Sequence, residues 1–165
     1  MYRDFHDVAN SSERKWGNST RAITIVCRGE SGGGWFQEGV SADVQETLRR
    51  VYSPSLSQHD LLCLVWWARN RLYFEQELQL RSDVLLVNYD RLVGDSNQQF
   101  AEIMSFLGVR YRQWTVNQVH GNSRGRHTAA RLNRQVEELC SSLKEELDTV
   151  ARAQAASGTS TGEAP

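Results

Sequence analysis

The run Asp83–Tyr89 (DVLLVNY) constrains the fold of this chain more than any other stretch. Its four uninterrupted apolar residues, Val84 to Val87, predict a short strand that is covered on both faces. Most of the remaining apolar residues recur at helical spacing, so helices alternate with at most a few buried strands. We therefore expect an α/β fold with a parallel sheet.

Apolar spacing and capping residues predict five helices. These cover residues 7–16 with Asp7 as N-cap, 41–51 with Ser41 as N-cap, 58–78, 96–107 ending at Gly108, and 132–152. The β-branched stretch Arg21–Cys27 predicts a short strand or an extended connection, and residues 1–3 the end of a strand. We expect one domain over residues 1–152 and a disordered, low-complexity tail over residues 153–165.

Charge and cysteine content narrow the class of protein. The net charge of −1 argues against a general nucleic-acid binder or a membrane-surface protein. No apolar run approaches the roughly 18–20 residues that a membrane span needs. The three cysteines, Cys27, Cys63 and Cys140, fit neither a zinc spacing nor a disulfide framework, which suits a reducing, cytoplasmic compartment.

The first residues contain a candidate anion site. Arg3 follows a predicted strand end, and Ser11 comes eight residues later in the predicted helix. A planar guanidinium, a hydroxyl and the N–H groups of a helix start together suit a phosphate. The alternative is that Arg3 pairs with Asp4 or Asp7 and that Ser11 faces water. The glycine-rich stretch 29–34 lacks the GK[ST] ending of a phosphate loop and predicts a loop or lid.

Three segments in order resemble the PAPS-dependent sulfotransferases. In DVLLVNYDRLVGDSNQQFAEIMSFLGV, a predicted strand ends in Tyr-Asp-x-Leu and the next helix ends in Phe-Leu-Gly, as in that family. YRDFHDVANS is similar to the family's 3′-phosphate element. GWFQEGVS and WWARNRLYFEQEL resemble the helical region of bacterial members. The resemblance covers roughly residues 1–150.

This resemblance implies a P-loop-kinase-like, three-layer α/β domain with a central parallel sheet. It also implies transfer of a sulfuryl group from PAPS to a hydroxyl or amine of a small-molecule or carbohydrate acceptor, leaving PAP, without a metal. Basic groups and helix N-termini would stabilise the charge that develops on the bridging oxygen.

The resemblance assigns cofactor contacts one by one. Arg3 and Ser11 match the ligands of the 3′-phosphate. Tyr89 matches a tyrosine near the adenine, with a core tyrosine as the alternative reading. Ser123 is a looser match, to a serine near the adenine. Arg124 and Arg126 stand roughly where the family has a basic loop that closes over the 3′-phosphate. The alternative for these two arginines is a solvated basic loop.

One part of the family pattern is absent from this sequence. The family's first strand leads into a loop of the Pro-Lys-Ser/Gly-Thr-Thr type, which holds the 5′-phosphosulfate, and its general base precedes the 3′-phosphate element. We therefore expect a C-terminal fragment without this strand–loop–helix, and no sulfuryl transfer by the isolated chain. His6, His59, His120 and His127 are candidate bases by residue type alone, so no catalytic residue is assigned.

Two other functions compete with this interpretation. A non-catalytic module could retain PAP(S) binding and have lost transfer. A nucleotide kinase is a weaker alternative, because the sequence has neither GK[ST] nor a metal-binding acidic strand end.

Overall fold

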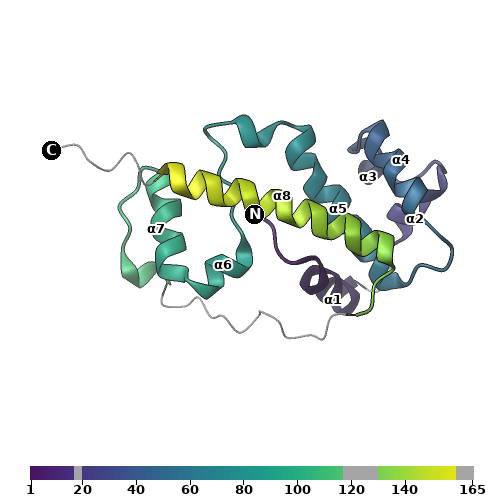
Figure 1. The fold of residues 1–165 in the computed structure, drawn as a ribbon, viewed down its shortest axis with the longest axis horizontal. Helices are drawn as coiled ribbons and strands as arrows, with labels where there is room; N and C mark the ends of the chain where they lie inside the picture. The colour runs from purple at the N-terminus through teal and green to yellow at the C-terminus, as the bar shows by residue number, and fades with distance from the viewer. Residues whose placement is uncertain (17–19, 117–129, 159–165) are drawn as a thin grey trace.

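Helices form almost the whole structure, which is a computed structural model that describes residues 1–16, 20–116 and 130–158 (Figure 1). The α-helices are α1 (Phe5–Trp16), α2 (Arg21–Arg28), α3 (Trp35–Glu38), α4 (Ala42–Val51), α5 (Gln58–Glu75), α6 (Tyr89–Gly94), α7 (Ser96–Phe106) and α8 (Arg134–Gly158). Two short 3₁₀ helices are η1 (Leu78–Leu80) and η2 (Gln113–Val116).

Helix α5 is the centre of the core. Its buried residues include Leu62, Leu64, Trp66 and Trp67, which lie on different sides of the helix. A helix that is apolar on most of its circumference needs cover on several sides. Helices α1, α2, α4 and α8 supply that cover (Figure 1). The broad apolar stripe predicted for residues 58–78 is thus confirmed, although α5 ends at Glu75 and η1 follows.

The predicted α/β fold is wrong. The structure is 70% helical with 1% strand, and its described residues contain no sheet, so neither the three-layer P-loop-kinase-like architecture nor a central parallel sheet is present. The only strand-like pairing among those residues is a single parallel bridge between Tyr2 and Asn88. In the predicted strand Asp83–Tyr89, Asp83 lies in a turn, residues 84–87 lead to this bridge without regular secondary structure, and α6 begins at Tyr89.

A side chain of α8 takes the place that a neighbouring strand would occupy. Gln154 accepts a hydrogen bond from the Leu86 N–H (2.8 Å) and donates one to the Val84 carbonyl (3.1 Å). Backbone N–H and carbonyl groups that are shielded from water need hydrogen-bond partners. Here the Gln154 amide is the partner of one N–H group and one carbonyl group. An apolar run can therefore be buried and extended without joining a sheet.

The stretch from Arg21 is also helical, contrary to the strand or extended connection that was expected. Ile23, Val26 and Cys27 are buried at intervals of three and one residues, which is the spacing of one helix face. Packing of this face outweighs the β-preference of its branched residues. Gly29 ends α2 with φ +70°, a conformation that glycine adopts without strain.

The other predicted helices are confirmed, with shifted ends. Ser41 accepts a hydrogen bond from the Val44 N–H and caps α4, as expected. Helix α1 starts at Phe5 instead of Asp7, and α8 extends to Gly158, six residues into the segment that was expected to be a disordered tail. Residues 159–165 lie outside the described residues.

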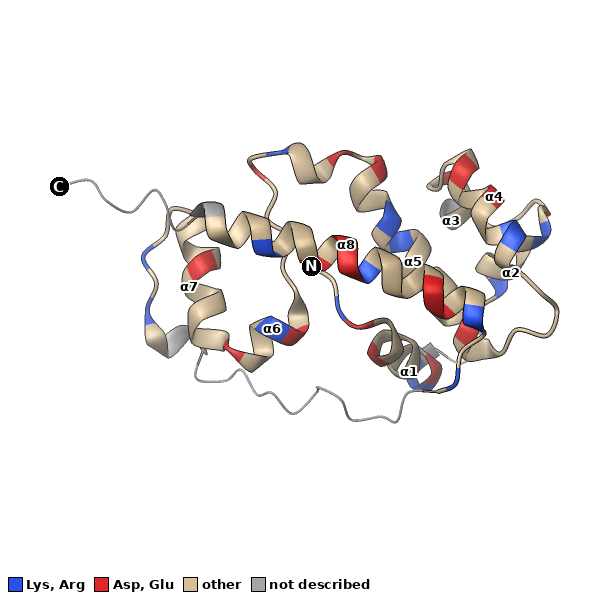
Figure 2. Cartoon of the chain, in the orientation of Figure 1, with Lys and Arg blue, Asp and Glu red and all other residues tan. Residues whose placement is uncertain are grey.

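Acidic and basic residues are spread over many helices, although the charged residues of α2 are only arginines and α7 carries only an acidic residue (Figure 2). This distribution agrees with the net charge of −1. Among the described residues, no helix combines the length and the apolar character that crossing a membrane requires.

The Gln154 contacts give the first prediction. We expect Gln154→Ala to lower the free energy of unfolding by about 1–3 kcal/mol, because two backbone groups of the extended segment lose their partners. Urea denaturation followed by circular dichroism measures this change. Glu145→Ala, an exposed position on the same helix, is the control and should change little. Equal stability of the two variants would contradict the role of Gln154.

Candidate functional site

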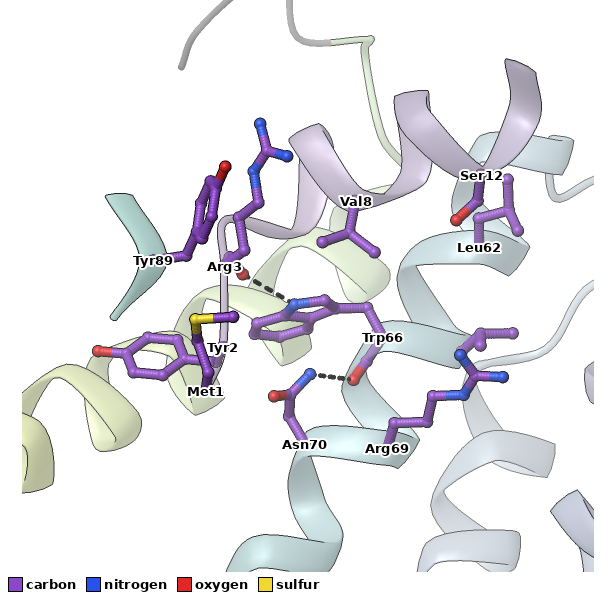
Figure 3. A pocket seen from close by; sticks show the side chains of 11 residues that line it. Met1, Tyr2, Arg3, Val8, Ser12, Leu62, Trp66, Arg69, Asn70 and Tyr89 are labelled. Carbon is purple, nitrogen blue, oxygen red and sulfur yellow. Dashed lines mark hydrogen bonds between the residues drawn. The ribbon is translucent and has the colours of Figure 1, made fainter. Parts of the chain in front are cut away.

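The candidate site lies where the first residues of the chain meet the start of α6. The Tyr2 N–H donates to the Val87 carbonyl (3.0 Å), and the Tyr89 N–H donates to the Tyr2 carbonyl (2.8 Å). This bridge makes Arg3 and Tyr89 neighbours, with the Arg3 guanidinium carbon 5.0 Å from the centre of the Tyr89 ring (Figure 3). Two residues that sequence reasoning placed in one site are thus in contact.

Carboxylates orient the Arg3 guanidinium. Its Nη2 lies 2.9 Å from Asp7 Oδ2, and its Nε lies 3.9 Å from Asp90 Oδ1. The Arg3 carbonyl accepts a hydrogen bond from Trp66 Nε1 at 2.9 Å, which fixes the backbone at the same residue (Figure 3). Because 24% of the Arg3 side chain is exposed, an anion can approach the group from solvent.

The start of α1 differs from the arrangement that was expected. Asp4, not Asp7, accepts hydrogen bonds from the first helical N–H groups, those of His6 (3.0 Å) and Asp7 (3.4 Å). A carboxylate thus already occupies the helix N-terminus that was assigned to a phosphate. Asp90 in turn accepts a hydrogen bond from the Asp4 N–H at 3.1 Å.

Ser11 is half-buried in α1. Asp7 and Ser11 are four residues apart in this helix, so they lie on the same side of it, and Asp7 contacts Arg3. The eight-residue spacing of Arg3 and Ser11 predicted a shared site. In the structure, Ser11 lies one helical turn beyond Asp7, the ion-pair partner of Arg3. Ser123, Arg124 and Arg126 lie outside the described residues.

A buried polar cluster anchors the bridge to α8. The Tyr2 hydroxyl donates to Asp148, and the Asn88 amide donates to Asp148 (2.8 Å) and to the Tyr2 hydroxyl (3.2 Å). Lys144 forms an ion pair with the second Asp148 oxygen at 3.0 Å. Asn88 also caps α6 by accepting from the Asp90 and Arg91 N–H groups. We call Tyr2, Asn88, Lys144 and Asp148 the anchor cluster.

The anchor cluster shifts the acidity of its members. Desolvation and the Asp148 carboxylate raise the pKa of Tyr2, so its hydroxyl stays protonated and donates. Burial alone would raise the pKa of Asp148, but the hydrogen bonds from Tyr2, Lys144 and Asn88 outweigh it and the pKa lies below its ordinary value. Asp148 is therefore ionised at neutral pH.

A cavity of about 880 Å³ adjoins Arg3 and Tyr89. Its lining comes from four parts of the chain: the first residues, α1, α5 and the start of α6 (Figure 3). Val8, Leu62, Val65 and Trp66 form most of its apolar wall, and Ser12 and Arg69 add polar groups. Sequence reasoning missed this cavity because its wall forms only where α1 packs against α5. The apolar residues on α1 and α5 gave no indication that they would share a wall.

The two histidines among the described residues, His6 and His59, contact each other. His6 Nδ1 lies 3.3 Å from His59 Nε2, and Glu13 lies 3.7 Å from the other His59 nitrogen, so these groups link α1 to α5. His120 and His127 lie outside the described residues. Among the described residues, no group of three or more His, Cys, Asp or Glu side chains could hold a metal ion.

The cysteines are buried thiols. Burial raises the pKa of Cys27 and of Cys63 to about 12, so neither is a ready thiolate at neutral pH.

Comparisons with protein-family models, with curated proteins and with solved structures found no significant match for this chain.

The anchor cluster predicts a specific acid sensitivity. Because the folded pKa of Asp148 is below the ordinary value of 3.8, its stabilisation is present above that pH and is lost as the pH falls towards the folded pKa. We expect wild type to be more stable than Asp148→Asn at pH 6, and the difference to shrink below about pH 4. Urea titrations between pH 3 and pH 6 measure it. A difference that stays constant with pH would contradict the assignment.

Proposed function

We propose that this chain binds the 3′-phosphate end of PAPS or PAP as part of a PAPS-dependent sulfotransferase. The observation that carries the proposal is the contact between Arg3 and Tyr89, which stand 86 residues apart in the sequence and which the resemblance assigns to one nucleotide. In the proposed complex, Arg3 donates hydrogen bonds to phosphate oxygens and Ser11 adds a hydroxyl. The Tyr89 ring lies beside the adenosine.

The positive charge of Arg3 supports a phosphate ligand, and the neighbouring carboxylates limit its affinity. The guanidinium group has five N–H donors in a plane, which matches the oxygens of a phosphate. Asp7 and Asp90 contact the same group and oppose a second anion. Among the described residues assigned to the site, Arg3 is the one on which binding should depend most strongly, since Ser11 and Tyr89 are neutral.

The proposed acceptor is a small molecule or a carbohydrate with a hydroxyl or amine, and the proposed compartment is the reducing cytoplasm. Transfer itself requires a group that neutralises the leaving oxygen of the 5′-phosphate. The sequence contains no Lys-Ser/Gly-Thr-Thr loop that could do this. The second candidate function is a non-catalytic PAP-binding module.

The test compares PAP with adenosine 5′-monophosphate, which lacks the 3′-phosphate, by isothermal titration calorimetry. We expect PAP to bind more tightly, and Arg3→Ala to weaken PAP binding by about 1.5–3 kcal/mol, the range for hydrogen bonds to charged groups. Binding of the monophosphate should change little. Arg134→Ala is the control, because Arg134 is exposed on α8 and pairs with Glu138.

Unchanged PAP affinity in Arg3→Ala would overturn the 3′-phosphate assignment. In a transfer assay with PAPS labelled in its sulfuryl group, we expect no transfer by this chain under either candidate function. Transfer of label to an acceptor by this chain would contradict the binding-module function.

A further inference from the structure

The cavity beside Arg3 has the dimensions and lining of a small-molecule site. At about 880 Å³ it falls within the range of roughly 300–1,000 Å³ that ligand pockets occupy. Four apolar residues, Val8, Leu62, Val65 and Trp66, contribute to its wall from two helices. Such a wall favours a ligand with an apolar body, because burial of apolar surface drives its binding.

Arginines give this cavity its charge. Arg3 and Arg69 line it, and the described residues that form its wall include no acidic side chain. In Figure 3, Arg3 lies beside Tyr89 on one side of Trp66, and the Arg69 side chain extends from α5 on the other side. Asp7 and Asp90 already offset the charge of Arg3. Arg69 places a second guanidinium in the cavity wall that Leu62 and Val65 also line.

The wall of the cavity is held in place before any ligand binds. Trp66 Nε1 donates to the Arg3 carbonyl (2.9 Å), and the Asn70 amide donates to the Trp66 carbonyl (2.8 Å). Both contacts join residues that line the cavity (Figure 3). A preformed site loses less conformational entropy on binding than one that must be ordered.

We propose that this cavity binds an amphipathic organic anion, with its apolar body against Val8, Leu62, Val65 and Trp66 and its anionic group at Arg69. The ligand class is a carboxylate, sulfonate or sulfate on an aromatic or aliphatic body. This site goes beyond the 3′-phosphate contact at Arg3, and the proposal does not require that the chain binds PAP.

The probe for this site is 8-anilinonaphthalene-1-sulfonate, an aromatic sulfonate that fluoresces when shielded from water. We expect saturable binding at one site. Arg69→Gln should weaken it about fivefold, the effect of losing one exposed charge contact, and Arg69→Glu should weaken it further. Arg71→Gln is the matched control on the same helix, since Arg71 pairs with Glu146 and does not line the cavity, and it should leave binding unchanged.

A neutral probe, N-phenyl-1-naphthylamine, separates the apolar contact from the charge. Its binding should be unchanged in Arg69→Gln, and Val65→Phe, which fills the cavity, should weaken both probes. Circular dichroism confirms that each variant is folded before it is titrated. The proposal is overturned if Arg69→Gln and Arg71→Gln weaken sulfonate binding equally. It is also overturned if Arg69→Gln leaves sulfonate binding unchanged.

Competition with PAP distinguishes this site from the proposed nucleotide site. We expect excess PAP to leave sulfonate binding unchanged. Competitive displacement would assign the cavity to the nucleotide and overturn the organic-anion site, while leaving the proposed function intact.

Discussion

The half-buried carboxylate of Asp148 is the contact on which the arrangement of the candidate site depends. It accepts hydrogen bonds from Tyr2 and Asn88, which belong to segments 86 residues apart, and so attaches both segments to α8. The Tyr2–Asn88 bridge then places Arg3 against Tyr89. A satisfied buried network of this kind favours one arrangement, because each broken contact leaves a polar group without a partner.

Helix α8 replaces part of a sheet in this structure. Asp148 and Gln154 lie on the same helix six residues apart, and together they hold the extended segment 84–88 through side-chain hydrogen bonds. Two short extended segments meet at one bridge, which is too little pairing to form a stable sheet alone. The surrounding helices, above all α5 and α8, therefore bury the apolar side chains instead.

Local sequence signals predicted the helices well and the fold class poorly. Ser41, the Ser57–Asp60 capping box and Gly108 define helix ends through contacts within a few residues, so these ends can be read from sequence. The run Val84–Val87 is ambiguous, because an apolar run indicates burial and not the partner that buries it. Arg21–Arg28 was misassigned for a related reason: its branched residues indicate strand, whereas its buried face follows helical spacing.

The sequence by itself determined the spacing of Arg3 and Ser11, the central apolar helix and the capping of most helices, since these depend on neighbours along the chain. Only the tertiary structure decided that Arg3 meets Tyr89 and that α1 and α5 enclose a cavity with Arg69 in its wall. These features depend on side chains that are distant in sequence. Their contacts exist only after the helices pack, so no local pattern encodes them.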